Sequence, residues 1–138
     1  NMISPNMYGT AYGPLVVQKQ RLRLPNEMSL YYPQLKYIGG EFLYDTSKGK
    51  VRTYGPRLVE NIIQALARIV ITDQILEIQR MPEVDVVMQV HDEIIAIGSS
   101  LNGHATMDNI LNIMRTPPEW CSDLPLDAEG GVSQIYDK

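Results

Sequence analysis

Three adjacent polar residues, His91, Asp92 and Glu93, interrupt the apolar stretch "VDVVMQVHDEIIAIG" of residues 84–98. Carboxylate oxygens are ligands that Mg²⁺ prefers, and a protein usually supplies only one or two of them. Neighbouring residues of a strand point to opposite faces, so the two acids aim at one point only if a bend turns one of them. We therefore expect one of the two acids, Asp92 or Glu93, to bind metal and the other to assist or to take no part, with His91 close to a phosphate or a sugar.

Other interpretations of the same residues remain open. A solvated hairpin tip explains the triplet as well, because polar residues are common at turns. An iron site of two histidines and one carboxylate is disfavoured, since His91 and His104 are not spaced as such ligands. The sequence also lacks a G-x-S-x-G elbow, a P-loop and a G-x-G-x-x-G loop, which excludes the simplest hydrolase and nucleotide-binding signatures.

The elements around the triplet are predicted from periodicity and from proline positions. β-Branched residues on both sides of the triplet predict a hairpin with the polar residues at its bend. Pro56 opens a helical run over 56–81, and Pro82 ends it. Apolar residues cover most of that run, which predicts burial on more than one side. A second, shorter helix is expected near 103–115.

One side of the long helix is polar. Arg57, Asn61, Gln64 and Arg68 follow one another at spacings of three or four, and Glu60 precedes Gln64 by one turn. A polar stripe on an apolar helix faces either water or a polar ligand. The pattern alone does not choose between these two.

Composition limits the class of protein. The chain has 138 residues, is 44% hydrophobic and carries a net charge of −4, which suits one acidic domain with room for a local basic patch. A single cysteine, Cys121, excludes a disulfide framework and favours an intracellular setting. We expect no membrane span and no signal peptide. Residues 1–15 are expected to form an irregular arm, and turn signals at Gly39–Gly40 and Lys48–Gly49 predict short hairpins.

Four segments resemble family A DNA polymerases, those similar to bacterial DNA polymerase I. "QVHDE", Gln89–Glu93, resembles their motif C, and "TYGPRLVENIIQALAR", Thr53–Arg68, resembles the helix that precedes motif C in phage members. "RLRLPNEMSLYYP", Arg21–Pro33, and "MRTPPEWCSDLPLDAEGGVSQIY", Met114–Tyr136, resemble two further blocks of that branch. The blocks occur in the family's order and cover about residues 16–138.

The resemblance implies a chemistry. In this family the motif C aspartate, here Asp92, binds the catalytic magnesium, and the acid at Glu93 contributes less. The complete enzyme uses two Mg²⁺ ions while the primer 3′ hydroxyl attacks the α-phosphate of a deoxynucleoside triphosphate and pyrophosphate leaves.

The resemblance also implies contacts with primer–template DNA. His91 matches the histidine that lies against the primer end, and Gln64 matches a glutamine that contacts the minor groove of the new base pair. Minor-groove acceptors are nearly independent of sequence, so a donor there tests the shape of the pair. Arg68 and Arg57 are expected to meet phosphates nearby. Ile69 departs from the family pattern, because phage members usually carry an acid there.

Neither a motif A aspartate nor a motif B helix is found in the sequence. We therefore expect an α+β fold that is part of a polymerase palm, over residues 16–138: a small antiparallel sheet with the motif C hairpin, packed on the long helix and the shorter one. The chain alone is expected to be inactive and to need the remainder of the polymerase. Alternatives are a subunit of a split polymerase, or a non-catalytic module that binds DNA or a replication protein.

Partners and location follow from the same resemblance. Primer–template DNA and a deoxynucleoside triphosphate are expected to bind the complete enzyme, in the cytoplasm or nucleoid of a bacterial host. Apolar surface left where the remaining palm would pack is expected to promote self-association.

Overall fold

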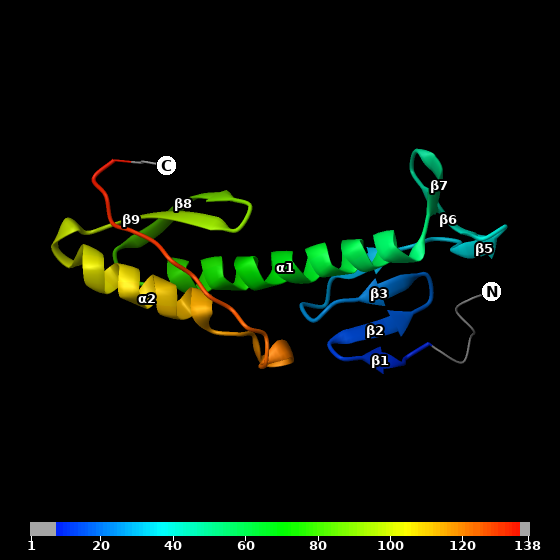
Figure 1. Ribbon diagram of the computed structural model, residues 1–138, viewed down its shortest axis with the longest axis horizontal. Helices are drawn as coiled ribbons and strands as arrows, with labels where there is room; N and C mark the ends of the chain where they lie inside the picture. Colours follow the sequence, from blue (N-terminus) through cyan, green and yellow to red (C-terminus); the bar gives the residue numbers. More distant parts are fainter. Residues whose placement is uncertain (1–7, 136–138) are drawn as a thin grey trace. The chain divides into compact units, whose positions relative to one another are not determined.

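The structure, a computed structural model, describes residues 8–135 and divides into two compact units, Asn1–Ala67 and Arg68–Lys138. Figure 1 shows one long helix, α1 (Gly55–Gln79), that contributes residues to both units. The described residues form small antiparallel sheets and two α-helices. The predicted α+β class is therefore confirmed.

The first sheet of unit 1 is an antiparallel meander. Its strands, in sheet order, are β1 (Ala11–Tyr12), β2 (Leu15–Gln18), β3 (Arg21–Arg23) and β4 (Ser29–Tyr31). Val17, Leu22 and Leu30 are cross-strand partners, so their side chains share one face of the sheet. Arg21 and Tyr31 are partners as well and share the opposite face.

Within the irregular arm predicted for residues 1–15, the structure places the short strand β1. Residues 1–7 lie outside the described residues, but Tyr12 pairs with Leu15 across a turn in which Gly13 has a φ of +56°. A two-residue strand carries too little alternation to be recognised from sequence. Gly13 allows the tight reversal, because glycine adopts a positive φ without a steric penalty.

The second sheet of unit 1 contains the two hairpins that turn signals predicted. It consists of β5 (Lys36–Ile38), β6 (Glu41–Thr46) and β7 (Gly49–Thr53). Gly39 and Gly40 both have positive φ, as a type I′ turn requires, and the second turn lies between Thr46 and Gly49. Tyr37 packs on Phe42 with ring centroids 5.0 Å apart.

Helix α1 begins and ends close to the predicted bounds of 56–81. Pro56 lies in its first turn, where the missing N–H costs nothing, and Glu83, with a φ of +59°, follows its end. The predicted burial on more than one side is wrong. Only Ile69, Gln74 and Ile78 are buried, whereas Val59, Ile63 and Leu76 are each more than half exposed. An apolar pattern leads to burial only where another element packs on it, and no described element covers these three side chains.

Unit 2 contains the predicted hairpin and the predicted shorter helix. Its elements after α1 are β8 (Val84–Val90), β9 (Glu93–Gly98), η2 (Ser100–Asn102), α2 (Gly103–Arg115) and η3 (Glu119–Cys121). Ile78 is fully buried and Val84 nearly so, which places the small core where α1 ends and β8 begins. The Gln79 amide links the same two elements: it accepts from the Val86 N–H at 2.9 Å and donates to Asp85 at 3.2 Å.

The expected single small sheet is replaced by three separate sheets. The hairpin β8–β9 is a two-stranded sheet of its own, and neither sheet of unit 1 pairs with it. Strands before α1 pair with their sequence neighbours through short turns, so their backbone donors and acceptors are satisfied locally. Hydrophobic patterning predicts strands but does not say which strands join one sheet.

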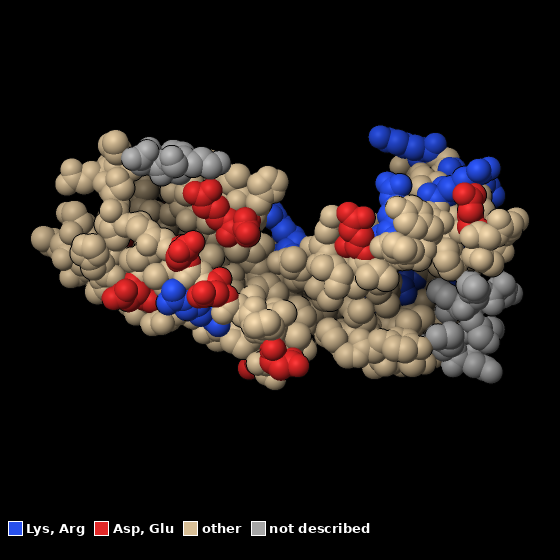
Figure 2. Space-filling model, in the orientation of Figure 1, with Lys and Arg blue, Asp and Glu red and all other residues tan. Residues whose placement is uncertain are grey.

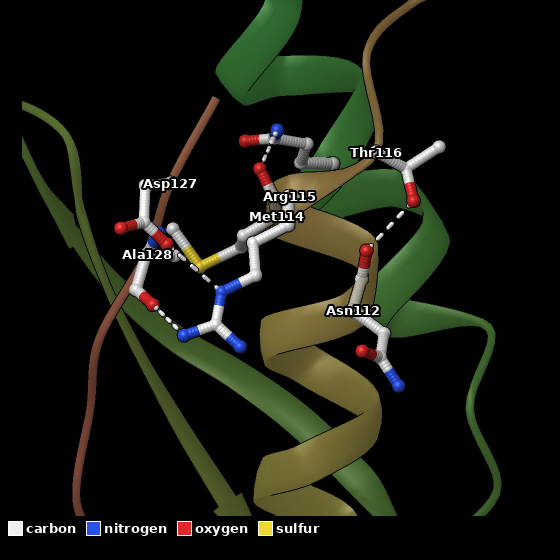
Figure 3. A network of polar contacts seen from close by, with 7 residues as sticks. Asn112, Met114, Arg115, Thr116, Asp127 and Ala128 are labelled. Atoms are coloured by element: carbon white, nitrogen blue, oxygen red, sulfur yellow. Dashed lines mark hydrogen bonds and ion pairs between the residues drawn. The ribbon is translucent and has the colours of Figure 1, made fainter. Parts of the chain in front are cut away.

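The segment after α2 lies along unit 2 in extended form (Figure 1). Figure 3 shows Arg115 at the end of α2 reaching this segment. Its guanidinium binds the Asp127 carboxylate at 3.0 Å and also donates to the Ala128 carbonyl. Gly130 lies so close to α2 that a Cβ there would be 3.1 Å from the Met107 sulfur.

Candidate metal and DNA-binding residues

The bend of the hairpin β8–β9 consists of His91 and Asp92, and Glu93 is the first residue of β9. Val90 pairs with Glu93 and closes the two-residue turn. His91 has a φ of +55°, a left-handed conformation that histidine adopts more readily than most non-glycine residues. The Gln89 side chain donates to the His91 carbonyl at 2.7 Å and fixes the turn from within.

All three polar side chains at the bend are exposed. The carboxylates of Asp92 and Glu93 take no ion-pair partner among residues 8–135, so both are available to an external ligand. No cluster of three or more His, Cys, Asp or Glu suitable for a metal occurs in the described part of the chain. Carboxylate oxygens are ligands that suit Mg²⁺.

Gln64 lies in unit 1 and is held by its neighbour one turn earlier. Its amide nitrogen donates to a Glu60 carboxylate oxygen at 3.2 Å, which leaves the second N–H of the amide free. Gln64 also borders a shallow hollow of about 410 Å³, here called the tyrosine hollow. The hollow is lined by Leu30, Tyr31, Tyr32, Tyr44, Asn61, Gln64 and Ala65.

The sequence did not predict the tyrosine hollow. Tyr32 and Tyr44 meet edge to face with centroids 5.3 Å apart, and both are half-buried. Burial raises the pKa of the Tyr32 hydroxyl; a hydrogen bond with the Asn61 side chain lowers it, and the Tyr44 hydroxyl raises it. The clustering of tyrosines in residues 31–44 was the available signal, together with the amides on the polar stripe of α1.

Arg57 and Arg68 are exposed on α1, the first in unit 1 and the second at the start of unit 2. Neither forms an ion pair with another residue of the described stretch. Arg57 and Gln64 are seven residues apart on the helix and therefore share one side of it. Of the predicted polar stripe, Arg57 and Gln64 are exposed and Asn61 is half-buried in unit 1, whereas Arg68 is exposed in unit 2. The triplet His91–Glu93 also belongs to unit 2.

The contact of Arg115 with Asp127 is structural and was not predicted. Hydrogen bonding from the Ala128 backbone N–H and from Arg115 lowers the pKa of the Asp127 carboxyl. In the same part of unit 2, Gln74 of α1 donates to the Met114 carbonyl of α2 at 2.9 Å (Figure 3). These contacts hold the end of α2 against its neighbours.

One comparison links the chain to a protein of stated activity. It is 38% identical over 90 residues to a protein named DNA polymerase from Bacillus phage SP02. The match covers 65% of this chain but 13% of the phage protein, so the chain spans a small part of its relative's length. No family model matches the chain, and no solved structure does. No helix within residues 8–135 is long and apolar enough to cross a membrane.

Proposed function

We propose that this chain is the C-terminal palm segment of a family A DNA polymerase of the phage type, with motif C at its hairpin turn. The observation that carries the proposal is the 38% identity over 90 residues to a phage DNA polymerase. The order of the four family-like blocks supports it, and so does the exposed position of Asp92 at a two-residue turn.

Asp92 is the metal ligand in this proposal. A carboxylate at the end of a hairpin can approach a cation and a triphosphate without displacing core residues, and hydrogen bonds inside the turn limit its motion. Magnesium, when bound, stabilises the negative charge that develops on the attacking and leaving oxygens. Glu93 starts the next strand and supplies a second carboxylate close by. The absence of a three-residue acidic cluster in residues 8–135 agrees with a site completed by another region.

The DNA contacts fall on four further side chains. Gln64 offers a free amide N–H to minor-groove acceptors while Glu60 holds the other one. His91 lies at the turn next to Asp92, where the primer end would meet the metal. Exposed Arg57 and Arg68 are available for phosphates. Minor-groove acceptors are common to all base pairs, so these contacts suit a polymerase that must copy any sequence.

The chain alone is expected to be inactive, because one hairpin cannot place two metals and a nucleotide. Its catalytic partner is the rest of the polymerase, either in the same chain or as a second subunit of a split enzyme. Exposed apolar residues on α1 and on the hairpin, such as Ile63, Leu76 and Ile97, are where that partner would pack, or where copies would self-associate. The expected location is the cytoplasm or nucleoid of a bacterial host.

A chimaera tests the proposal. The phage SP02 polymerase would carry residues 53–115 of this chain in place of its own corresponding residues, and primer extension would be measured. We expect Asp92→Asn to abolish extension, whereas Asp108→Asn, at an exposed acid of α2, leaves it unchanged. Extension at a normal rate by the Asp92→Asn chimaera would refute the role of Asp92.

A second measurement does not depend on activity. Titration of the isolated chain with Mn²⁺, followed by amide NMR, should broaden the signals of residues 91–93 first. Asp92→Asn should remove that broadening and Asp108→Asn should not. Broadening that is equal at both acids would mean that the cation recognises surface charge and no particular site.

A further inference from the structure

Charge is divided unequally between the two units. Residues 1–67 contain eight Lys and Arg and four Asp and Glu, a formal net charge of +4. Residues 68–138 contain four Lys and Arg and twelve Asp and Glu, a net charge of −8. The chain is therefore acidic overall, although unit 1 by itself is basic. Figure 2 shows Lys and Arg gathered around the sheet β5–β7, whose exposed basic residues are Lys36, Lys48, Lys50 and Arg52.

Several of the basic side chains in unit 1 are not neutralised locally. Lys19, Arg21, Lys36 and Lys48 take no ion-pair partner within residues 8–135, whereas Arg23 is paired with Glu27 at 3.0 Å. Lys19 and Gln20 form the turn between β2 and β3, so Lys19 precedes Arg21 by two residues. Unpaired exposed cations on one small unit are the electrostatic footprint of a polyanion site.

An aromatic ring lies in the same row as one of these cations. Gln18 of β2, Arg21 of β3 and Tyr31 of β4 are successive cross-strand partners, so their side chains share one face and adjoin one another. Tyr31 lies on β4, the edge strand of this sheet, and is 62% exposed. We call Gln18, Arg21 and Tyr31, with Lys19 at the adjacent turn, the basic row.

The basic row leads into the tyrosine hollow. Tyr31 belongs to both, and the next residue, Tyr32, stands against Tyr44 inside the hollow. The hollow adds the amides of Asn61 and Gln64 to these rings. It therefore combines flat apolar faces with hydrogen-bonding groups that can face a base edge or a sugar.

We propose that the basic row and the tyrosine hollow together bind a single strand of nucleic acid, with Lys19 and Arg21 on phosphates and a base stacked on Tyr31. An exposed tyrosine can stack only on a base that is not enclosed in a duplex, which is why a single strand fits better than paired DNA. The inference deepens the proposed function. It rests on that function at one point only, because Gln64 lines the hollow and is also a proposed DNA contact. It gives unit 1 a binding role that needs neither metal nor Asp92.

Equilibrium binding of a labelled oligothymidylate to the whole chain, in EDTA, tests this proposal. Tyr31→Ala should weaken binding about five- to a hundred-fold, since it removes one stacked base, and Tyr31→Phe should bind as the parent does. The matched control is Tyr12→Ala. Tyr12 is also about half exposed in the same sheet, but its pairing with Leu15 places it on the opposite, apolar face.

Salt dependence separates phosphate contacts from stacking. Arg21→Gln should lower the slope of log K against log salt concentration by about 0.7, the value for one lost phosphate contact to a single strand. Arg80→Gln, at an exposed arginine of unit 2, should leave the slope unchanged. Circular dichroism of each variant checks that the fold is retained, as expected for side chains as exposed as these.

Two further probes, a duplex of the same length and inorganic polyphosphate, make the outcomes decisive. Equal affinity for duplex and single strand, with no effect of Tyr31→Ala, would overturn the inference. So would polyphosphate that competes as well as the oligonucleotide does. Oligonucleotide binding that depends on Tyr31 while the Asp92→Asn chimaera still extends primers would sink the proposed function and leave this inference standing. Loss of extension in the Asp92→Asn chimaera, together with oligonucleotide binding that does not depend on Tyr31, would support the proposed function and overturn this inference.

Discussion

Substitutions at His91 test whether the turn that presents Asp92 has the backbone described here. A left-handed conformation such as the φ of +55° costs an ordinary residue about 1–2 kcal/mol, and glycine pays none of it. Replacing His91 by glycine removes this strain. The greater freedom of glycine in the unfolded chain lowers the free energy of unfolding by up to about 1 kcal/mol, so the net effect of His91→Gly should be neutral or slightly stabilising. His91→Val adds branching at Cβ to the same conformation and should destabilise by about 1 kcal/mol or more relative to the parent.

Thermal unfolding followed by circular dichroism would measure this order. For a unit of this size, about 1 kcal/mol corresponds to a shift of roughly 4–8 °C in Tm, well within measurement. Ile97, exposed on β9 of the same hairpin, provides the control because its φ is negative. There the order should reverse: Ile97→Gly destabilises and Ile97→Val changes little.

Equal stability of the Gly and Val variants at position 91 would refute the left-handed turn. Agreement would also isolate the role of the imidazole. His91→Gly keeps the turn and the carbonyl that Gln89 holds, so a loss of extension in the His91→Gly chimaera would come from the missing side chain alone.

Two further predictions concern unit 2. Gln74→Leu removes the donor to the Met114 carbonyl and should lower the free energy of unfolding by about 1–3 kcal/mol in urea titrations, because a partly buried carbonyl loses its partner. Asp127 has a folded pKa below its unfolded one, so its stabilising contribution is complete above the unfolded pKa and is lost as pH falls through the folded pKa. In a carboxyl NMR titration, Arg115→Gln should raise that pKa only partly toward the ordinary value, since the Ala128 N–H still donates. A full return would contradict the leading role of that N–H.

The elements nearest the candidate site could be predicted because their signals are local. The hairpin 84–98 has β-branched runs on both sides of a polar bend, and α1 is bounded by two prolines. The predicted helix 103–115 has the same first and last residues as α2 in the structure. In each case the residues that define the element lie inside it, so no distant contact was needed to recognise it.

Features that depend on distant pairing could not be predicted. The partition into three sheets depends on which strands pair with one another. The alternation of apolar and polar residues along a strand is the same whichever sheet the strand joins. The tyrosine hollow joins residues from β4, β6 and α1, and periodicity in any one of them gives no sign of the others. The exposure of Ile63 and Leu76 was missed for a related reason: an apolar pattern shows which side chains can be buried, while burial needs a neighbouring element.

The close approach of Gly130 to Met107 makes one side of α2 sensitive to oxidation. A methyl group at position 130 would lie 3.1 Å from the Met107 sulfur, which is closer than most such contacts. Conversion of that thioether to the sulfoxide adds a polar oxygen to this tightly packed contact. Peroxide would therefore loosen the segment around Gly130 from α2 while the hairpin turn at Asp92, which has no sulfur in its two loop residues, stays chemically intact.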